Sequence, residues 1–248
     1  MARRADKSGA KVVDHPFQRL QGQLSELIAA TPPGERLPAE PDLAKRLGVS
    51  RATLREAMRS FEGQGRIRRR QGVGTFVVSL SRVIDTGLEV LESIESLARK
   101  INLDVAMGDL RIDEIQANPQ QAEKFSIEPQ TQLVKIGRVI LADKRPVAYL
   151  IDILPLDIIT PEELGAGFTG SVLDMLLQRG EPVLTNSVAE IHAVASTVEV
   201  ARALEIQRGD VLLMFTAQLY TETGRMIDLS TSYFLPGYFK FHVVRRVA

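Results

Sequence analysis

The chain has 248 residues, of which 44% are hydrophobic and 25% charged, enough for two domains with ordinary soluble surfaces. It contains no cysteine, which excludes disulfides and thiolate metal sites and suits a reducing compartment. No apolar run approaches the roughly 18 residues of a membrane span, and the basic N-terminus lacks the apolar stretch of a secretory signal. We therefore expect a cytoplasmic protein.

The formal net charge of zero hides an uneven distribution. Residues 1–80 hold 15 Lys and Arg against 8 Asp and Glu, whereas the remainder holds 16 against 23. A basic N-terminal third joined to an acidic remainder favours a module that binds nucleic acid or a membrane surface. Halves of proteins often differ in charge, so this asymmetry alone decides little.

Residues 1–15 are expected to form a flexible arm. After Pro16 the apolar residues recur with the spacing of one helix face, and the segment TPPGERLP ends that helix. A second short helix is predicted from Pro41 to Leu47, followed by a turn at Gly48. Ser50 is a typical N-cap for a third helix, which we expect to run to about residue 61.

Three arginines form a stripe on this third helix. Arg51, Arg55 and Arg59 recur every four residues, and like charges at that spacing repel unless an anion lies against them. Two short helices joined by a glycine turn are typical of a helix-turn-helix, whose second helix reads base edges in the major groove. Arginine suits this task because its fork can bond O6 and N7 of guanine together.

The segment IRRRQGVGTFVV predicts a hairpin after the third helix. Its two β-capable runs, Ile67–Arg70 and Thr75–Val78, flank a glycine-rich tip. Such a wing would bring its small tip to the sugar-phosphate backbone or the minor groove, while Arg68 and its two neighbours meet phosphates. The alternative is a solvated basic hairpin beside a surface helix, which the order of these elements disfavours.

The stretch GERLPAEPDLAKRLGVSRATLREAMRSFEGQGRIRRRQGVGTFV resembles the winged helix-turn-helix of the GntR family of bacterial transcription regulators. The resemblance covers about residues 17–78 and implies base contacts from the third helix and a glycine at the wing tip. Pro41 departs from the family pattern, in which an arginine at this position contacts DNA. The expected DNA-binding residues are Arg36, Ser50, Arg51, Thr53, Arg55, Arg69, Arg70, Gly72 and Gly74.

Residues 16–79 are thus assigned to a winged domain, residues 80–87 to a linker and residues 88–248 to a second domain. A helix is predicted over residues 88–101. Strands are predicted at Val105–Ala117, Leu133–Ala142, Val147–Leu154, Ser187–Val194, Val211–Thr221, Met226–Phe234 and Phe239–Val247. Tight turns between consecutive strands favour an antiparallel α+β sheet over a doubly wound one.

Three helix starts are predicted in the second domain. Thr160 with Glu163 and Ser196 with Glu199 have the spacing of capping boxes. Ser171 is expected to begin a further helix, which the sequence ends at a glycine, residue 180.

The second domain resembles the UTRA effector domain, which indicates the HutC branch of the GntR family. The resemblance rests on the strand with Arg138, the segment from Pro146 to Pro155, and the stretches GSVLDMLLQRG, AEIHAVAS and LSTSYFLPGYFKFHVVRR. It implies a chorismate-lyase-like fold, an antiparallel sheet with flanking helices around a cavity for a small metabolite.

The resemblance also implies effector-binding residues. Arg138 matches an arginine that binds anionic groups, and Ser171 a serine at a helix N-terminus, where backbone amides favour an anion. Each could equally be structural, as a surface arginine and a plain N-cap. The expected effector-binding residues are Arg138, Asp152, Ser171, Glu190 and Tyr233.

Half of the family's sugar-phosphate set is replaced. A second arginine, a glutamate and an aspartate of the pattern are Ile140, Leu150 and Pro236 here. These losses make the pocket less polar, so we expect a small carboxylate or a more apolar acid rather than a phosphosugar as the anionic effector.

Together these features predict a ligand-responsive transcription regulator, a repressor that binds a palindromic double-stranded operator as a homodimer. The three scattered histidines and the absence of a nucleophile elbow or phosphate loop give no reason to expect an enzyme, a metal or a cofactor. The alternatives are an enzyme on a chorismate-lyase-like fold tethered to nucleic acid, and a non-specific nucleoid or membrane-surface protein.

Overall fold

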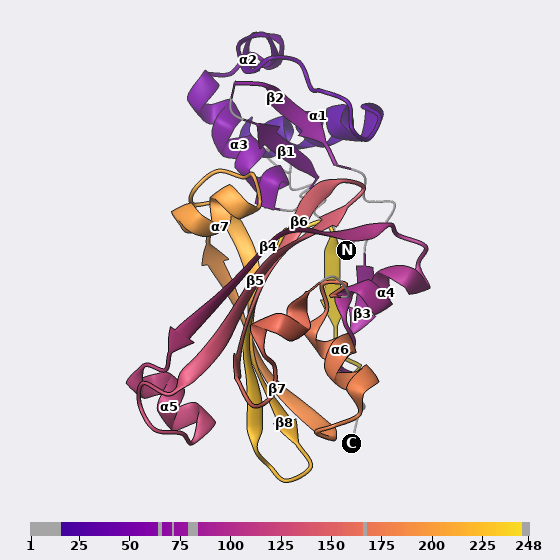
Figure 1. Ribbon diagram of the computed structural model, residues 1–248. Coiled ribbons are helices and arrows are strands. Elements are labelled where there is room, and N and C mark those ends of the chain that lie inside the picture. Colours follow the sequence, from indigo (N-terminus) through magenta and orange to yellow (C-terminus); the bar gives the residue numbers. More distant parts are fainter. Residues whose placement is uncertain (1–15, 64–65, 71, 79–83, 166–167, 245–248) are drawn as a thin grey trace, which may run out of the picture.

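The computed structural model describes residues 16–63, 66–70, 72–78, 84–165 and 168–244. A small helical domain with a hairpin lies at one end of a larger domain built on long strands (Figure 1). Helix α7 and the turn between strands β5 and β6 are the parts of the larger domain that face the smaller one (Figure 1). No helix within the described ranges is long and apolar enough to cross a membrane.

The N-terminal domain has the helix, helix, turn, helix and hairpin order expected of a winged helix-turn-helix. Its elements are α1 (Pro16–Ala30), α2 (Glu40–Leu47), α3 (Arg51–Gly63), β1 (Ile67–Arg70) and β2 (Gly74–Val77). Gly48 ends α2 in the left-handed conformation, at φ 67°, which a glycine adopts without strain. Leu24, Leu43 and Leu54, one from each helix, are completely buried in a shared core.

The C-terminal domain is an antiparallel six-stranded sheet in the order β4-β5-β6-β9-β8-β7, which confirms the α+β prediction. Its strands are β4 (Val105–Gln116), β5 (Gln132–Ala142), β6 (Arg145–Pro155), β7 (Leu184–Ala195), β8 (Val211–Thr221) and β9 (Met226–Phe234). A separate pair, β3 (Ile84–Gly87) and β10 (Phe239–His242), runs in parallel.

Helices cover both faces of this sheet. They are α4 (Ile94–Lys100), α5 (Pro119–Phe125), α6 (Val172–Arg179) and α7 (Val198–Ala203), with a 3₁₀ turn at Pro161–Leu164. Helices α4 and α6 lie on one side together with β3 and β10, and α5 and α7 lie on the other (Figure 1). The first of these sides holds the cavity described below.

Several local predictions need correction. Residues 84–87, expected in the linker, form β3 and pair with β10, while residues 80–83 lie outside the described part. The helix expected over residues 88–101 is only Ile94–Lys100, because Ser93 caps it by accepting a hydrogen bond from the Ser96 amide. The last strand ends at His242 rather than residue 247, and residues 245–248 are not described.

Two helix starts also differ from the prediction. Thr197 rather than Ser196 caps α7, because the Ser196 hydroxyl donates to the Gln207 carbonyl instead. Helix α5 was not predicted, although Asn118 followed by a proline and Gln121 forms a complete capping box there. The predicted starts at Thr160 and Ser171 are confirmed.

Candidate functional site

The start of helix α3 is fixed by a local hydrogen-bond network. The Thr53 amide donates to the Ser50 hydroxyl oxygen at 3.1 Å, and the two hydroxyls are 2.8 Å apart. Ser50 is therefore the N-cap, and it leaves the exposed Arg51 side chain on the first turn. Among the described residues Arg51 has no ion pair or hydrogen bond through its side chain, so its guanidinium is available to a ligand.

Two further candidate arginines, Arg55 and Arg69, share a carboxylate. Glu40, at the start of α2, accepts from Arg55 Nε at 2.7 Å and lies 3.4 Å from Arg69 Nε. The Arg69 side chain is only 17% exposed and also lies 3.6 Å from Glu62. Arg69 thus holds the hairpin against the helices, whereas the half-exposed Arg55 keeps one face open to a partner.

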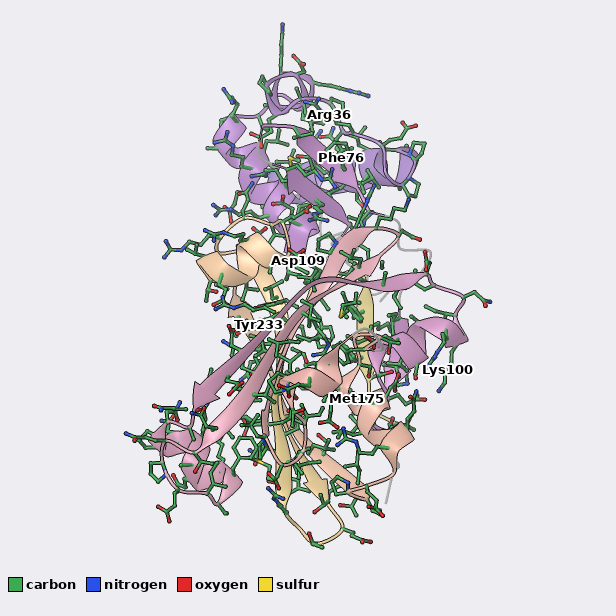
Figure 2. All side chains as sticks on the ribbon, viewed as in Figure 1. Arg36, Phe76, Lys100, Asp109, Met175 and Tyr233 are labelled. Atoms are coloured by element: carbon green, nitrogen blue, oxygen red, sulfur yellow. The ribbon has the colours of Figure 1, made fainter. Side chains whose placement is uncertain are left out.

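The tip of the hairpin is narrow because two glycines form it. Gly72 and Gly74 have φ of 74° and 137°, and a Cβ on Gly74 would collide with the Arg36 side chain. Arg36 is exposed and forms an isolated backbone bridge with Phe76, so both lie in the winged domain (Figure 2). The Arg70 guanidinium lies 5.6 Å from the Phe76 ring centre, within the range of a cation–π contact.

Arg68 does not have the phosphate-facing position expected for it. Its side chain is 9% exposed, and its Nη2 donates to the carbonyls of Leu204 and Glu205 at 2.8 and 3.1 Å. These carbonyls lie at the C-terminal end of α7, where a cation is favoured by the helix dipole. Arg68 therefore joins the hairpin to the second domain, a contact between residues 136 apart that no local pattern in the sequence reveals.

A cavity of about 500 Å³ lies on the α4 and α6 side of the large sheet. Its floor is made by alternate residues of successive strands, which share one face of the sheet. Asp152 pairs with Ser230 across β6 and β9, and Phe215 pairs with Ile191 across β8 and β7. The segment from Thr86 to Glu95 and the start of α6 complete the walls. This volume is typical of sites for small molecules.

The predicted effector residues Arg138, Asp152 and Ser171 all line this cavity. Arg138 and Asp152 form a buried ion pair, with 5% and 9% of their side chains exposed. The Ser171 hydroxyl accepts from the Asp174 amide at 2.9 Å, so it caps α6 as a structural residue would. Ser93 donates to Asp174 at 2.8 Å and thereby ties the segment before α4 to α6.

Glu190 and Tyr233, expected at the effector site, lie on the opposite face of the sheet. Their chain neighbours line the cavity, and side chains alternate along a strand. Tyr233 stacks near Tyr149 at a ring distance of 6.4 Å on the side of α7 (Figure 2). Glu190 is 74% exposed and lies 3.5 Å from His192. Neither residue belongs to the cavity.

The cavity contains two carboxylates that sequence analysis did not single out. Asp228 on β9 is 7% exposed, and its Oδ1 has no hydrogen-bond partner among the described residues. Glu95 on α4 likewise has a buried Oε1 without a described partner. Burial raises the pKa of Asp228 well above its usual value, and neighbouring Asp152 raises it further. The alternation of Asp228, Ser230 and Ser232 was the signal that could have identified this face.

Replacing Asp228 with asparagine is expected to make stability less dependent on pH. Because the folded pKa of Asp228 is raised, the native state binds more protons than the unfolded chain, and stability falls as pH rises from about 4 through the folded pKa. Asparagine keeps the size and cannot ionise. Urea denaturation should show Asp228→Asn more stable than the parent by about 1–3 kcal/mol at pH 8, with little difference at pH 4.

The partly buried carboxylate of Asp113 provides the control, because it lies on β4 outside the cavity and pairs with Arg111. Asp113→Asn should shift stability little at either pH. An equal advantage of Asp228→Asn at pH 4 and pH 8 would contradict a raised pKa as its cause.

Two family models match the chain. The model for bacterial regulatory proteins of the gntR family matches residues 17–77, and the UTRA domain model matches residues 102–240, more than half of the chain. The boundaries agree with the helical domain and with the large sheet. The winged elements and the sheet floor of the cavity lie in the two matched regions, whereas the cavity wall from Thr86 to Leu97 lies between them.

The relatives match this chain over most of their own length. The HTH-type transcriptional regulator YurK of Bacillus subtilis is 28% identical over 200 residues, which cover 80% of this chain and 81% of YurK. The histidine utilization repressor of Klebsiella aerogenes is 26% identical over 233 residues, covering 90% and 94%. The crystal structure of PhnF from Mycobacterium smegmatis has the same fold, with a TM-score of 0.63 at 20% identity over 92% of this chain and all of that one.

These matches confirm the resemblance inferred from the sequence. The chain belongs to the GntR family of bacterial regulatory proteins, in the HutC branch that joins a winged helix-turn-helix to a UTRA domain.

Proposed function

We propose that this regulator represses transcription by binding a palindromic operator, and that a small molecule in the UTRA cavity releases it. The observation that carries the proposal is Arg51 on the capped first turn of α3, which is exposed and has no side-chain partner among the described residues, in a chain that also holds a ligand-sized cavity. Some relatives, such as the histidine utilization repressor, are named as repressors, which favours repression over activation. The protein acts on chromosomal DNA in the cytoplasm and performs no catalytic step.

The regulator acts as a homodimer in this proposal, because two recognition helices must reach successive major grooves of a palindromic site. We propose that the two copies meet along strand β7, which lies at one edge of the large sheet. It is twelve residues long and ends the strand order of the described sheet, and its Val188 is 54% exposed. A long unpaired edge with exposed apolar residues is a ready template for pairing with another chain.

The effector is proposed to bind on the shared face of β5, β6, β8 and β9. An acidic group could reach Arg138 through its Nε, which has no hydrogen bond among the described residues. It would compete there with Asp152, which already pairs with the same guanidinium. An acidic group would therefore meet a single nitrogen of Arg138, its Nε.

DNase footprinting tests the regulator role. The purified chain should protect a palindromic sequence in the DNA flanking its own gene, at physiological salt and with excess competitor DNA. The protected site should span two half-sites about one helical turn apart. Protection that spreads evenly over all sequences would instead indicate non-specific binding and overturn the proposal.

A further inference from the structure

The effector cavity has an excess of acidic groups. Five carboxylates line it and a single guanidinium, Arg138, is the only described cation among its lining residues. The acidic lining residues are Glu89, Glu92, Glu95, Asp152 and Asp228. Burying an excess of negative charge in a partly closed cavity is unfavourable in free energy unless each carboxylate has a partner.

Four of the five carboxylates have partners. Asp152 pairs with Arg138, Glu92 with Lys100, Glu89 accepts from the backbone amide of Val244, and Asp228 shares a hydrogen bond with Asp152. Asp228 and Glu95 each keep one buried oxygen without a described hydrogen-bond partner. Buried polar atoms of native proteins are normally paired, so these two oxygens indicate a missing donor.

The two carboxylates that keep an unpartnered oxygen lie on different walls of the cavity. Asp228 belongs to β9 and shares the floor with Asp152, whereas Glu95 belongs to α4, which covers that floor. The lining also includes the apolar side chains of Leu150, Phe215 and Phe234. A ligand that fits both surfaces has an apolar body and a group that donates hydrogen bonds to carboxylates.

We propose that the effector is a small organic cation whose basic nitrogen donates to Asp228 and Glu95 and whose apolar part packs against Phe215 and Phe234. An ammonium group carries three donors and no acceptor, which suits a site with surplus carboxylate oxygens. Charge-assisted hydrogen bonds of this kind are about twice as strong as neutral ones. The inference rests on the proposed function, since it names the ligand class of the regulator's cavity.

The charges around the two carboxylates make this binding dependent on pH. Burial raises the pKa of Asp228 and of Glu95, so both carboxyls are protonated more readily than in free solution. The groups that face them are Arg138 on β5, Asp152 on β6 and Asp174 on α6. A bound cation favours the ionised carboxylates, so binding releases protons and tightens as pH rises.

Isothermal titration calorimetry on the full chain tests the proposal with three probes of one shape. These are 2-phenylethylamine as the cation, 2-phenylethanol as the neutral compound and 3-phenylpropanoate as the anion. We expect the amine to bind at least about tenfold more tightly than the other two, the factor that one charge-assisted hydrogen bond supplies. Titrations in buffers of different ionisation enthalpy should show proton release on binding of the amine.

Two variants assign the effect to the cavity. Asp228→Asn should weaken binding of the amine by at least about tenfold and leave binding of the alcohol unaffected. The control Asp113→Asn should leave the binding of both compounds unchanged. Comparing the three probes on the unaltered chain keeps the proposal testable even if Asp228→Asn does not fold.

Several results would overturn the proposal. They are tighter binding of the anion than of the amine, no binding of the amine, equal amine binding by Asp228→Asn, or displacement of the amine by magnesium chloride at constant ionic strength. Footprinting of the same preparation distinguishes failure of the cationic-effector proposal from failure of the repressor proposal. A specific footprint with an anion-selective cavity overturns only the cationic effector, whereas the lack of any specific footprint overturns the repressor.

Discussion

Replacing Arg51 with alanine is expected to weaken binding to the cognate operator by about 1–3 kcal/mol, roughly 5- to 150-fold, and to relax discrimination at the base it contacts. Arg51 lies on the first turn of α3, the part of a recognition helix that reaches base edges. Its side chain has no partner among the described residues, so no internal ion pair has to break before it binds. Equilibrium titration of operators with single base changes measures both effects.

Two other arginines serve as controls for this prediction. Arg70 is exposed on the hairpin. Arg70→Ala should weaken binding to all DNA sequences alike and reduce the slope of log affinity against log salt concentration by about one. Arg111 is 78% exposed on the large sheet, and Arg111→Ala should leave DNA binding unchanged. If Arg51→Ala weakened binding to every DNA sequence to the same extent, Arg51 would contact phosphate rather than a base.

The sequence predicts features that neighbouring residues determine. Ser50 caps α3 and Gly48 ends α2 as expected, because a hydroxyl N-cap and a left-handed glycine act on the adjacent turn alone. Strands β8 and β9 begin and end where the alternating pattern places them. These elements require no knowledge of what lies far away in the chain.

The sequence does not predict which face of a strand is covered. Tyr233 and Ser232 are neighbours on β9, and only the pairing of β9 with β6 and β8 determines which of them faces the cavity. The resemblance pointed to Tyr233, yet the register places Ser232 in the lining and Tyr233 beside Tyr149. A shift of one residue exchanges all inward and outward side chains, so this information resides in the register.

Long-range contacts are the other feature that the sequence does not disclose. Strand β3 forms only because β10, more than 150 residues later, supplies its partner. Arg68 belongs to a run of three arginines that reads as a uniform basic patch. In the fold the three arginines have different contacts. Arg68 donates to the Leu204 carbonyl after α7, Arg69 lies beside Glu40, and Arg70 lies over the Phe76 ring.

Replacing Arg68 with methionine is expected to loosen the contact between the winged domain and α7. Methionine fills a similar volume and removes the hydrogen bonds to the carbonyls of Leu204 and Glu205. Hydrogen bonds from a charged donor contribute about 1.5–3 kcal/mol each. Hydrogen–deuterium exchange of the amides of residues 198–206 should therefore become faster, by about tenfold or more, because each 1.4 kcal/mol is a factor of ten.

Arg66 is the matched control on the same side of the hairpin. It donates to Ser25 at 2.9 Å and lies over the Phe61 ring, so its described contacts stay inside the winged domain. Arg66→Met should change exchange within the winged domain and leave residues 198–206 unaltered. Unchanged exchange of residues 198–206 in Arg68→Met would show that this contact does not hold the two domains together.

The same variant should reduce the effect of an effector on DNA binding. Ser187, Ala189 and Ile191 of β7 line the cavity, β7 leads directly into α7, and the carbonyl of Leu204 after that helix accepts from Arg68 in the wing. Coupling between two sites of a regulator is usually about 1–3 kcal/mol, a 5- to 150-fold change in affinity.

If the α7 contact transmits this coupling, operator affinities of Arg68→Met with and without effector should converge, whereas those of Arg66→Met should differ as in the parent. An undiminished ratio in Arg68→Met would place the transmission elsewhere, in the segment that joins the two domains. Because Arg68 of the hairpin contacts backbone carbonyls that follow α7, a shift of β7 on ligand binding would reach the wing without requiring a change in the winged domain's own core.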